Sequence, residues 1–130
     1  MEETKQTGYR IREHVGPTKR YCQTLELRDD PALIAEYRRI HSEACMWHEI
    51  MEGIRSVGIL EMDIYIFGTK LFMIVETALD FEWDTAMARL ATLPRQAEWE
   101  ELTGRYQKVS EGATSDEKWQ LMERIFHLYS

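Results

Sequence analysis

Cysteine is scarce in this sequence. The 130 residues contain two cysteines, Cys22 and Cys45, which lie far apart and form no CxxC pair. A small secreted domain that depends on disulfides carries more cysteines at closer spacing, so that class of protein is excluded. The two cysteines predict free thiols in a reducing compartment, and we therefore expect a cytoplasmic protein.

Long apolar runs are missing as well. Stretches such as Leu71–Val75 fall far short of the roughly 20 residues that a membrane-spanning helix needs. Met1–Lys5 lacks the apolar core of a signal peptide. Basic residues are too few for a phosphate track, because 16 Lys and Arg face 23 Asp and Glu, with a net charge of −7. We expect neither a membrane nor a nucleic acid as partner.

Motifs that bind metals or phosphates are also lacking. The sequence has no HExxH, no GxSxG, no glycine-rich phosphate loop and no Cys/His set spaced as metal ligands, so we expect no metal and no organic cofactor. A hydrophobic fraction of 44% over 130 residues suffices for one core. Residues 1–18 are polar and without periodicity, which predicts a loosely held leader ahead of a single domain at 19–130.

The first half of the chain shows both strand and helix periodicity. Alternating residues over Tyr21–Leu27 predict a strand. Asp30 and the proline after it are typical of a helix start, and helical periodicity follows with a break near Ser42. Leu60–Phe67 and Leu71–Thr77 are predicted as strands joined by a short hairpin. The second is apolar at nearly every position, so we expect it inside a sheet.

Two helices and a strand are predicted in the second half. Helical spacing covers Asp80–Leu90, with Asp80 as the cap, and Pro94–Tyr106, while Trp119–Leu128 is strand-like. The order β-α-β-β-α-α-β is that of an α+β, ferredoxin-like fold with one antiparallel sheet and helices on one face. The strands are too hydrophobic for the other face to remain in water. We therefore expect a homodimer of the dimeric α/β barrel type.

His41 is the histidine best placed for chemistry. Leu33, Tyr37 and His41 follow one another at intervals of four residues, so they project from one helix face, which carries apolar residues toward the core. An imidazole beside a phenol suits general acid/base catalysis near neutral pH. The alternative is a core histidine that is satisfied by a backbone carbonyl. His48 is predicted on the solvent side of its helix.

Trp99 lies in the most charged predicted helix, within Gln96–Glu101. An aromatic side chain in these surroundings is either an anchor on the apolar face or a flat platform for a ligand. Flat platforms suit sugars, whose C–H faces are apolar while their hydroxyls need polar partners. The remaining tryptophans, Trp47, Trp83 and Trp119, are predicted as core or interface residues.

Several segments resemble the L-rhamnose mutarotase family. Glu36–His41 followed by Trp47–Ile50 resembles the family's EYxxxH…WPE segment. The resemblance runs from about Lys19 to Leu128 and rests on the order and spacing of its segments together. The further segments are Gly58–Tyr65, Leu71–Glu76, Glu98–Trp99 and the closing Glu117–Phe126.

This resemblance implies a dimeric ferredoxin-like fold without cofactor, and a reaction that interconverts the α and β anomers of a 6-deoxy-L-hexose. The expected sugar is L-rhamnose, with L-fucose second. By resemblance, His41 is the proton donor and Tyr37 contacts the substrate. Glu98 and Trp99 stand at the family's aromatic sugar platform, where only Trp99 is aromatic here, and Met62 stands at the position of a second substrate tyrosine.

Mutarotation needs a proton at the ring oxygen and the removal of one from the anomeric hydroxyl. We expect His41 to donate to the ring oxygen and to recover the proton on closure, with Glu98, Asp63 or a bound water as the second group. Trp99 would stack on the sugar. Two other functions stay open from the residues alone: a cofactor-free oxygenase-like enzyme on the same fold, and a non-catalytic module that binds a small metabolite.

Overall fold

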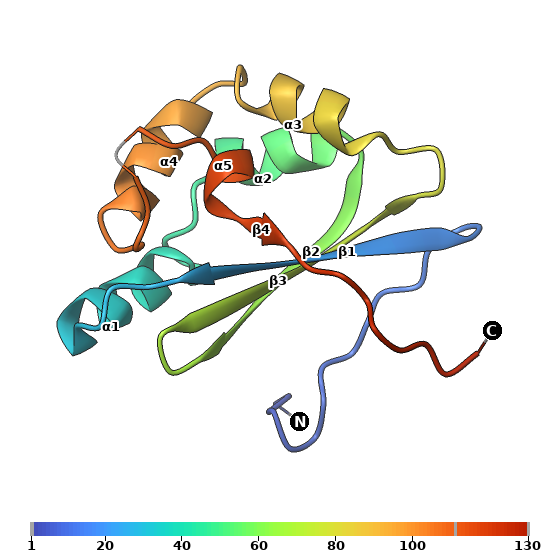
Figure 1. Ribbon diagram of the computed structural model, residues 1–130, viewed down its shortest axis with the longest axis horizontal. Coiled ribbons are helices and arrows are strands. Elements are labelled where there is room, and N and C mark those ends of the chain that lie inside the picture. Colours follow the sequence, from blue (N-terminus) through green and yellow to red (C-terminus); the bar gives the residue numbers. More distant parts are fainter. Residues whose placement is uncertain (1, 111, 130) are drawn as a thin grey trace.

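The computed structural model describes residues 2–110 and 112–129, and within them four strands form one antiparallel sheet with five helices on one of its faces (Figure 1). The spatial order β2-β3-β1-β4 confirms the predicted α+β, ferredoxin-like fold. The strands are β1 (Thr18–Glu26), β2 (Ile59–Phe67), β3 (Lys70–Ala78) and β4 (Gln120–Leu121), and the helices are α1 (Pro31–Ile40), α2 (His48–Ser56), α3 (Trp83–Leu90), α4 (Gln96–Gly104) and α5 (Ser115–Lys118).

Strand β3 lies between β1 and β2, as its continuous apolar sequence predicts. Side chains alternate across a strand, so Leu71, Met73 and Val75 share the face that is covered by the helices. Val75 is fully buried, and its partners in the register are Tyr21 on β1 and Met62 on β2. These residues form the floor of the hydrophobic core.

Helix α1 begins and ends where the sequence indicates. The Asp30 carboxylate accepts hydrogen bonds from the backbone N–H groups of Ala32 and Leu33 at 2.9 and 3.3 Å, and proline occupies the first helical position. The helix ends at Ile40, and α2 begins only at residue 48. The predicted break near Ser42 is therefore confirmed, and it leaves His41 at the C-cap of α1.

Helices α3 and α4 begin later than predicted. Helix α3 starts at Trp83 rather than near Asp80, because the chain first turns to bring Phe81 against the core, where the Lys19 ammonium donates to its carbonyl oxygen at 2.7 Å. Helix α4 starts at Gln96 rather than at Pro94, because Arg95 has a left-handed backbone with φ of 65°. The short helix α5 was not predicted from the sequence.

The last strand is much shorter than the predicted Trp119–Leu128. Only Gln120 and Leu121 pair with β1, and the chain then leaves the edge of the sheet. The prediction is wrong beyond this point because the apolar side chains of the segment alternate to both sides, and no described part of the same chain covers them. Ile125 is 93% exposed and Phe126 is 73% exposed.

The leader runs on the face of the sheet opposite the helices (Figure 1). The Arg12 guanidinium donates to the Glu61 carboxylate of β2 at 2.8 Å. Tyr9 packs edge-on against Tyr65, with ring centroids 5.7 Å apart. Both contacts hold the leader to the outer side of β2.

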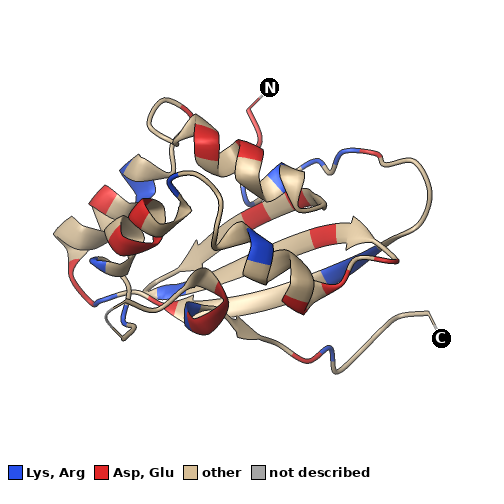
Figure 2. Ribbon diagram, turned by 90° about the horizontal axis from the view of Figure 1, so that it is seen from above, with Lys and Arg blue, Asp and Glu red and all other residues tan. Residues whose placement is uncertain are grey.

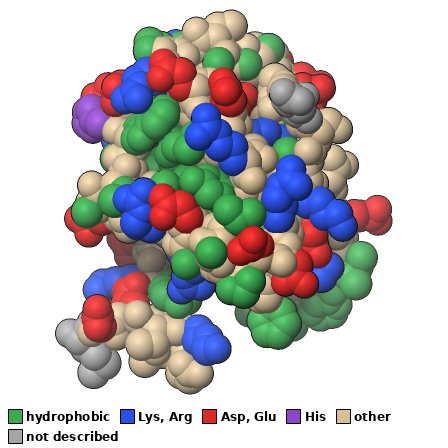
Figure 3. Space-filling view, turned by 90° about the vertical axis from the view of Figure 1, so that its left-hand side faces the viewer, with side chains coloured by type: hydrophobic (Ala, Val, Ile, Leu, Met, Phe, Trp, Pro, Cys, Tyr) green, Lys and Arg blue, Asp and Glu red, His purple; other side chains and the backbone are tan. Residues whose placement is uncertain are grey.

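Charges are dispersed over the surface. Figure 2 shows Asp and Glu distributed over helices and strands, with Lys and Arg between them rather than gathered in one track. Figure 3 faces the side that carries α1 and α4, where hydrophobic side chains reach the surface among charged ones. Of the helices described, none is long and apolar enough to cross a membrane.

Candidate active site

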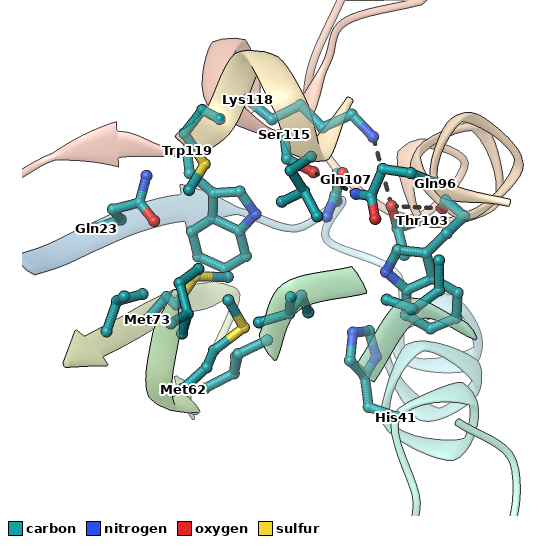
Figure 4. A pocket seen from close by; sticks show the side chains of 18 of the residues that line it. Gln23, His41, Met62, Met73, Gln96, Thr103, Gln107, Ser115, Lys118 and Trp119 are labelled. Atoms are coloured by element: carbon teal, nitrogen blue, oxygen red, sulfur yellow. Dashed lines mark hydrogen bonds between the residues drawn. The ribbon is translucent and has the colours of Figure 1, made fainter. Parts of the chain in front are cut away.

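A cavity lies between the inner face of the sheet and the helices. The space not filled by protein atoms, with the open solvent at its mouth included, is about 710 Å³. Apolar side chains line the strand side apart from Gln23 of β1, and the other polar ones gather on the side of α4 and α5 (Figure 4). The polar wall residues are Gln23, Gln96, Thr103, Gln107, Ser115 and Lys118, and the rings are those of Tyr37, His41, Trp83, Trp99 and Trp119.

His41 projects into this cavity from the end of α1 (Figure 4). Its Nδ1 lies 2.8 Å from the backbone carbonyl oxygen of Tyr37, one helical turn earlier. A carbonyl oxygen only accepts, so Nδ1 carries the hydrogen of the neutral ring and Nε2 keeps its lone pair. The backbone carbonyl that would satisfy a core histidine is thus present. It occupies only one ring nitrogen and leaves the other for a ligand.

Burial controls the charge of this imidazole. It lowers the pKa of His41 below the ordinary value, and the hydrogen bond to the Tyr37 carbonyl opposes the shift without cancelling it. The resting ring is therefore neutral at pH 7. A neutral imidazole with a free Nε2 is a proton acceptor.

A row of aromatic side chains holds His41 in place. The His41 ring lies edge-on to Trp99 with centroids 5.1 Å apart, and Trp99 meets Trp47 in the same way at 5.3 Å. The Arg95 guanidinium stacks over Trp47 at 3.9 Å from the ring centroid and donates to Glu49 at 3.2 Å. Arg95, whose backbone is left-handed, thus stands at the outer end of this row of rings.

Tyr37 stands beside His41, with ring centroids 4.3 Å apart. Its side chain is buried, and its hydroxyl accepts a hydrogen bond from the Gln107 amide at 3.1 Å. Burial raises the pKa of Tyr37 to about 12, against the smaller effect of that hydrogen bond. The phenol therefore keeps its proton, which is free to be donated to a ligand.

The structure brings four of the five predicted site residues to one cavity: Tyr37, His41, Met62 and Trp99 all line it. Glu98 lies apart, because its side chain is 65% exposed on α4 and pairs with Arg95 at 3.7 Å. Its neighbour in the helix, Trp99, points inward and is buried.

Met62 reaches the cavity through a β-bulge. The register of β2 shifts between Ile59 and Glu61, so Ile59 and Met62 both face inward although they are three positions apart. Asp63 follows Met62 and therefore faces the outer side of the sheet. Asp63, one of the candidates for the second proton-transfer group, is thus not in the cavity.

Sequence reasoning missed the polar wall of the site. The Gln96 amide nitrogen donates to Glu100 at 3.3 Å and to Ser115 at 3.5 Å. The Lys118 ammonium donates to the Glu100 backbone carbonyl, and lies 3.4 Å from the Thr103 hydroxyl. No periodicity marks these residues, because the turn at Arg95 and the unpredicted helix α5 bring them together.

His48 and Trp119 both lie where the sequence predicts. His48 is exposed and pairs with Glu52 at 2.8 Å, which confirms its predicted place on the solvent side. Trp119 is buried and lines the cavity, as a core residue would. Over residues 2–110 and 112–129, no group of three or more His, Cys, Asp or Glu side chains is placed to hold a metal ion.

Comparison with known proteins agrees with this fold. The family model of L-rhamnose mutarotase matches residues 20–128. An L-fucose mutarotase of Xanthomonas campestris is 38% identical over 110 residues, which cover 85% of this chain and 88% of the relative. A protein of Dictyostelium discoideum is 34% identical over 114 residues, with 85% and 90% covered.

The fold itself is found in a solved structure. The crystal structure of an L-rhamnose mutarotase from Formosa agariphila superposes with a TM-score of 0.63 at 17% identity, over 85% of this chain and 98% of that one. The match of the family model begins at the third residue of β1 and spans the other described strands and helices. The chain belongs to the L-rhamnose mutarotase family.

Proposed function

We propose that this protein is a mutarotase that interconverts the α and β anomers of a 6-deoxy-L-hexose. The observation that carries the proposal is the neutral imidazole of His41, whose free Nε2 lies in a cavity with a tryptophan wall and polar groups opposite. Membership of the family supports the reaction. The 38% identity to an L-fucose mutarotase supports L-fucose as a substrate beside L-rhamnose.

In the first step, His41 Nε2 accepts the proton of the anomeric hydroxyl. The electron pair on O1 forms the aldehyde as the C1–O5 bond breaks, and the imidazolium delivers the same proton to O5. Because O1 and O5 are bonded to the same carbon, one nitrogen can serve both. After rotation about C1–C2, the reverse steps on the other face of the aldehyde give the other anomer and restore neutral His41.

This order differs from the sequence-based expectation that His41 starts as a donor. A donor must be protonated at rest, and burial disfavours that form. Glu98 and Asp63 lie outside the cavity, so neither of them is the second group. No carboxylate is required there, because water can relay the proton. One positioned acid/base group contributes about 10²–10⁴-fold, which suffices for a reaction that already proceeds in water.

Three further residues are assigned to substrate binding. Trp99 offers its ring to an apolar face of the sugar. Tyr37 donates its free hydroxyl proton to a sugar oxygen, with Gln107 holding the phenol in place. Met62 contributes an apolar contact, because its thioether cannot form a strong hydrogen bond. The C6 methyl group of a 6-deoxy sugar suits such a surface.

The proposal is tested by anomer exchange. Saturation-transfer NMR on L-rhamnose and on L-fucose, with and without the protein, measures the rate at which each pair of anomers interconverts. We expect exchange faster than in buffer for at least one sugar. Saturable sugar binding without acceleration would replace the mutarotase with a non-catalytic binding module.

We also propose that the chain forms a homodimer. Ile125, Phe126 and Leu128 are each more than 70% exposed in the extended C-terminal segment. On the sheet face opposite the helices, Tyr65 is 39% exposed although Tyr9 of the leader packs against it, and Phe67 is 80% exposed at the end of β2. A second copy would bury both sets of side chains at once, which is the usual closed arrangement of soluble oligomers.

Light scattering during size-exclusion chromatography tests this assembly. The wild type is expected at twice the chain mass, and Phe126→Asp is expected to shift it toward the monomer. His127→Asp, with a carboxylate at the neighbouring position, is the matched control. A wild type that stays monomeric at all accessible concentrations would overturn the dimer.

The cytoplasm is the proposed compartment. Cys22 and Cys45 are both free thiols in the structure, each half-buried. Unpaired cysteines persist in a reducing compartment. Fractionation of the source cells, with an antibody to the protein, would test this placement.

A further inference from the structure

Two glutamine side chains are buried in the wall of the cavity. Gln96 is 3% exposed at the first position of α4, and Gln107 is 2% exposed where the chain forms an isolated bridge to Leu27. Both line the cavity (Figure 4). Among the residues that the structure describes, the side-chain oxygens of these two glutamines have no hydrogen-bond donor.

The orientation of the Gln96 amide follows from its neighbours. Its nitrogen lies 3.3 Å from the Glu100 carboxylate, which accepts hydrogen bonds and cannot donate when ionised. Glu100 is itself held by the backbone N–H of Ser115 at 3.2 Å. The nitrogen must therefore face Glu100, and the oxygen is left without a donor.

Gln107, on a different element, also has a side-chain oxygen without a donor. Its nitrogen donates to the Tyr37 hydroxyl at 3.1 Å, so its oxygen is the atom without a protein partner. The Tyr37 ring is in turn next to His41. One amide oxygen thus lies near the reacting end of the cavity, and the other lies beside α5.

A buried carbonyl oxygen without a donor is unfavourable, because it has lost its hydrogen bonds to water. A ligand with hydroxyl groups removes this penalty, since each O–H can donate to one amide oxygen. A ligand that lacks the hydroxyl leaves the oxygen unpaired and is rejected. Sugars carry such hydroxyls on successive ring carbons, and two acceptors on separate elements can recognise two of them.

We infer that Gln96 and Gln107 are specificity-determining residues, whose side-chain oxygens accept hydrogen bonds from two hydroxyl groups of the sugar. This inference rests on the proposed function and deepens it. L-rhamnose and L-fucose differ in configuration at C2 and C4, so acceptors fixed in the wall distinguish sugars by which hydroxyls reach them. Trp99 and Met62 supply the apolar contacts, while the two amides read the polar edge.

Deoxyfluoro sugars test the direction of these hydrogen bonds. Fluorine is close to a hydroxyl in size but cannot donate, so an analogue fluorinated at a recognised carbon leaves an amide oxygen unpaired. Calorimetric titration of the full-length protein compares the preferred parent sugar with its 2-, 3- and 4-deoxyfluoro analogues. We expect wild type to bind two of the three about tenfold more weakly than the parent.

Gln96→Met and Gln107→Met complete the cycle, because methionine has a similar length and no amide oxygen. Each variant is expected to weaken binding of the parent sugar about tenfold, and to bind one particular fluorinated analogue as well as the parent. Gln120→Met is the matched control, since the side chain of Gln120 is exposed outside the cavity. A general loss of structure would weaken all sugars alike and would not cancel one penalty.

The outcomes separate this inference from the proposed function. If wild type exchanges the anomers but every fluorine penalty is the same in Gln96→Met as in wild type, the inference is wrong and the mutarotase stands. If wild type binds no sugar, both are overturned. Should Gln107→Met unfold because Tyr37 loses its partner, Gln96→Met decides the question, with thermal melting as the check on its fold.

Discussion

The Nδ1 atom of His41 lies 2.8 Å from the carbonyl oxygen of Tyr37, the residue one turn before it in α1. This contact fixes the tautomer of the ring and leaves Nε2 as an acceptor. Helix α1 therefore positions the imidazole in two ways. His41 stands at the C-terminal end of the helix, and its ring is hydrogen-bonded to a backbone carbonyl of the same helix. The aromatic row of Trp99 and Trp47 supports the ring from the other side.

The first prediction concerns pH. Burial lowers the pKa of His41, and in the proposed mechanism the neutral ring is the active form. The rate of anomer exchange should rise with pH through a pKa below the ordinary value for histidine and then stay level. NMR exchange rates between about pH 4.5 and 8 measure this profile. A rate that falls as the pH rises through this range would show that the imidazolium is the active form.

The second prediction concerns stability at acid pH. Because the folded-state pKa of His41 lies below the unfolded one, the unfolded chain binds the proton more readily. The contribution of this residue to stability is thus fully present above the unfolded pKa and is lost as the pH falls below it. Urea denaturation of wild type and His41→Gln checks the direction of this effect. The difference between their free energies of unfolding should close or reverse toward acid pH.

The third prediction concerns the Tyr37 hydroxyl. Tyr37→Phe keeps the buried ring and leaves the Gln107 amide without its acceptor, so we expect a loss of about 1 kcal/mol in the free energy of unfolding. Tyr65→Phe removes a hydroxyl from a ring that is 39% exposed and serves as the control, with little change. Equal stabilities for the two variants in urea denaturation would show that the buried hydrogen bond contributes nothing.

The fourth prediction concerns Arg95, whose backbone φ is 65°. Arg95→Gly removes the stacking on Trp47 but suits the left-handed backbone, whereas Arg95→Ala removes the stacking and keeps a strained Cβ. The free energy of unfolding of the glycine variant should exceed that of the alanine variant by about 1 kcal/mol. Both should exchange anomers more slowly than wild type, because Trp47 no longer braces Trp99. A more stable alanine variant would contradict this reading of the turn.

The fifth prediction concerns the leader. Residues 2–17 precede β1 and lie outside the match of the family model. Their contacts to β2 are the Arg12–Glu61 ion pair, in which Arg12 is exposed, the packing of Tyr9 on Tyr65, and the largely buried His14, whose Nε2 lies 3.5 Å from Glu61. All three lie on the outer face of the sheet and not in the hydrophobic core, so we propose that the domain folds without the leader. The truncated chain should melt within a few degrees of the full chain and retain exchange activity. An unfolded truncated chain would show that the leader belongs to the core.

Much of the fold could be predicted because it depends on local patterns. The Asp30 cap, the hairpin between β2 and β3, and the central place of β3 follow from turn chemistry and periodicity. The strand predicted to Leu128 failed because alternation indicates which residues could be buried, not whether a neighbouring surface exists to bury them.

Helical spacing predicted one part of the site, and the family resemblance named Met62 and Trp99, which also line the cavity. Tyr37 and His41 lie one turn apart on a single helix, so the sequence alone places them together. The bulge that turns Met62 inward and the left-handed backbone of Arg95 depend on tertiary packing, and neither leaves a mark in periodicity. For the same reason, the buried amides of Gln96 and Gln107 could not be found without the structure.

The central claim, that His41 catalyses anomer exchange, is tested most directly by saturation-transfer NMR on wild type, His41→Ala and His48→Ala. L-fucose and L-rhamnose are measured in parallel. We predict that wild type and the exposed-site control His48→Ala accelerate exchange of the same sugar, and that His41→Ala keeps its fold but loses about 10²–10⁴-fold of the acceleration. Exchange by His41→Ala at the wild-type rate would remove His41 from the mechanism.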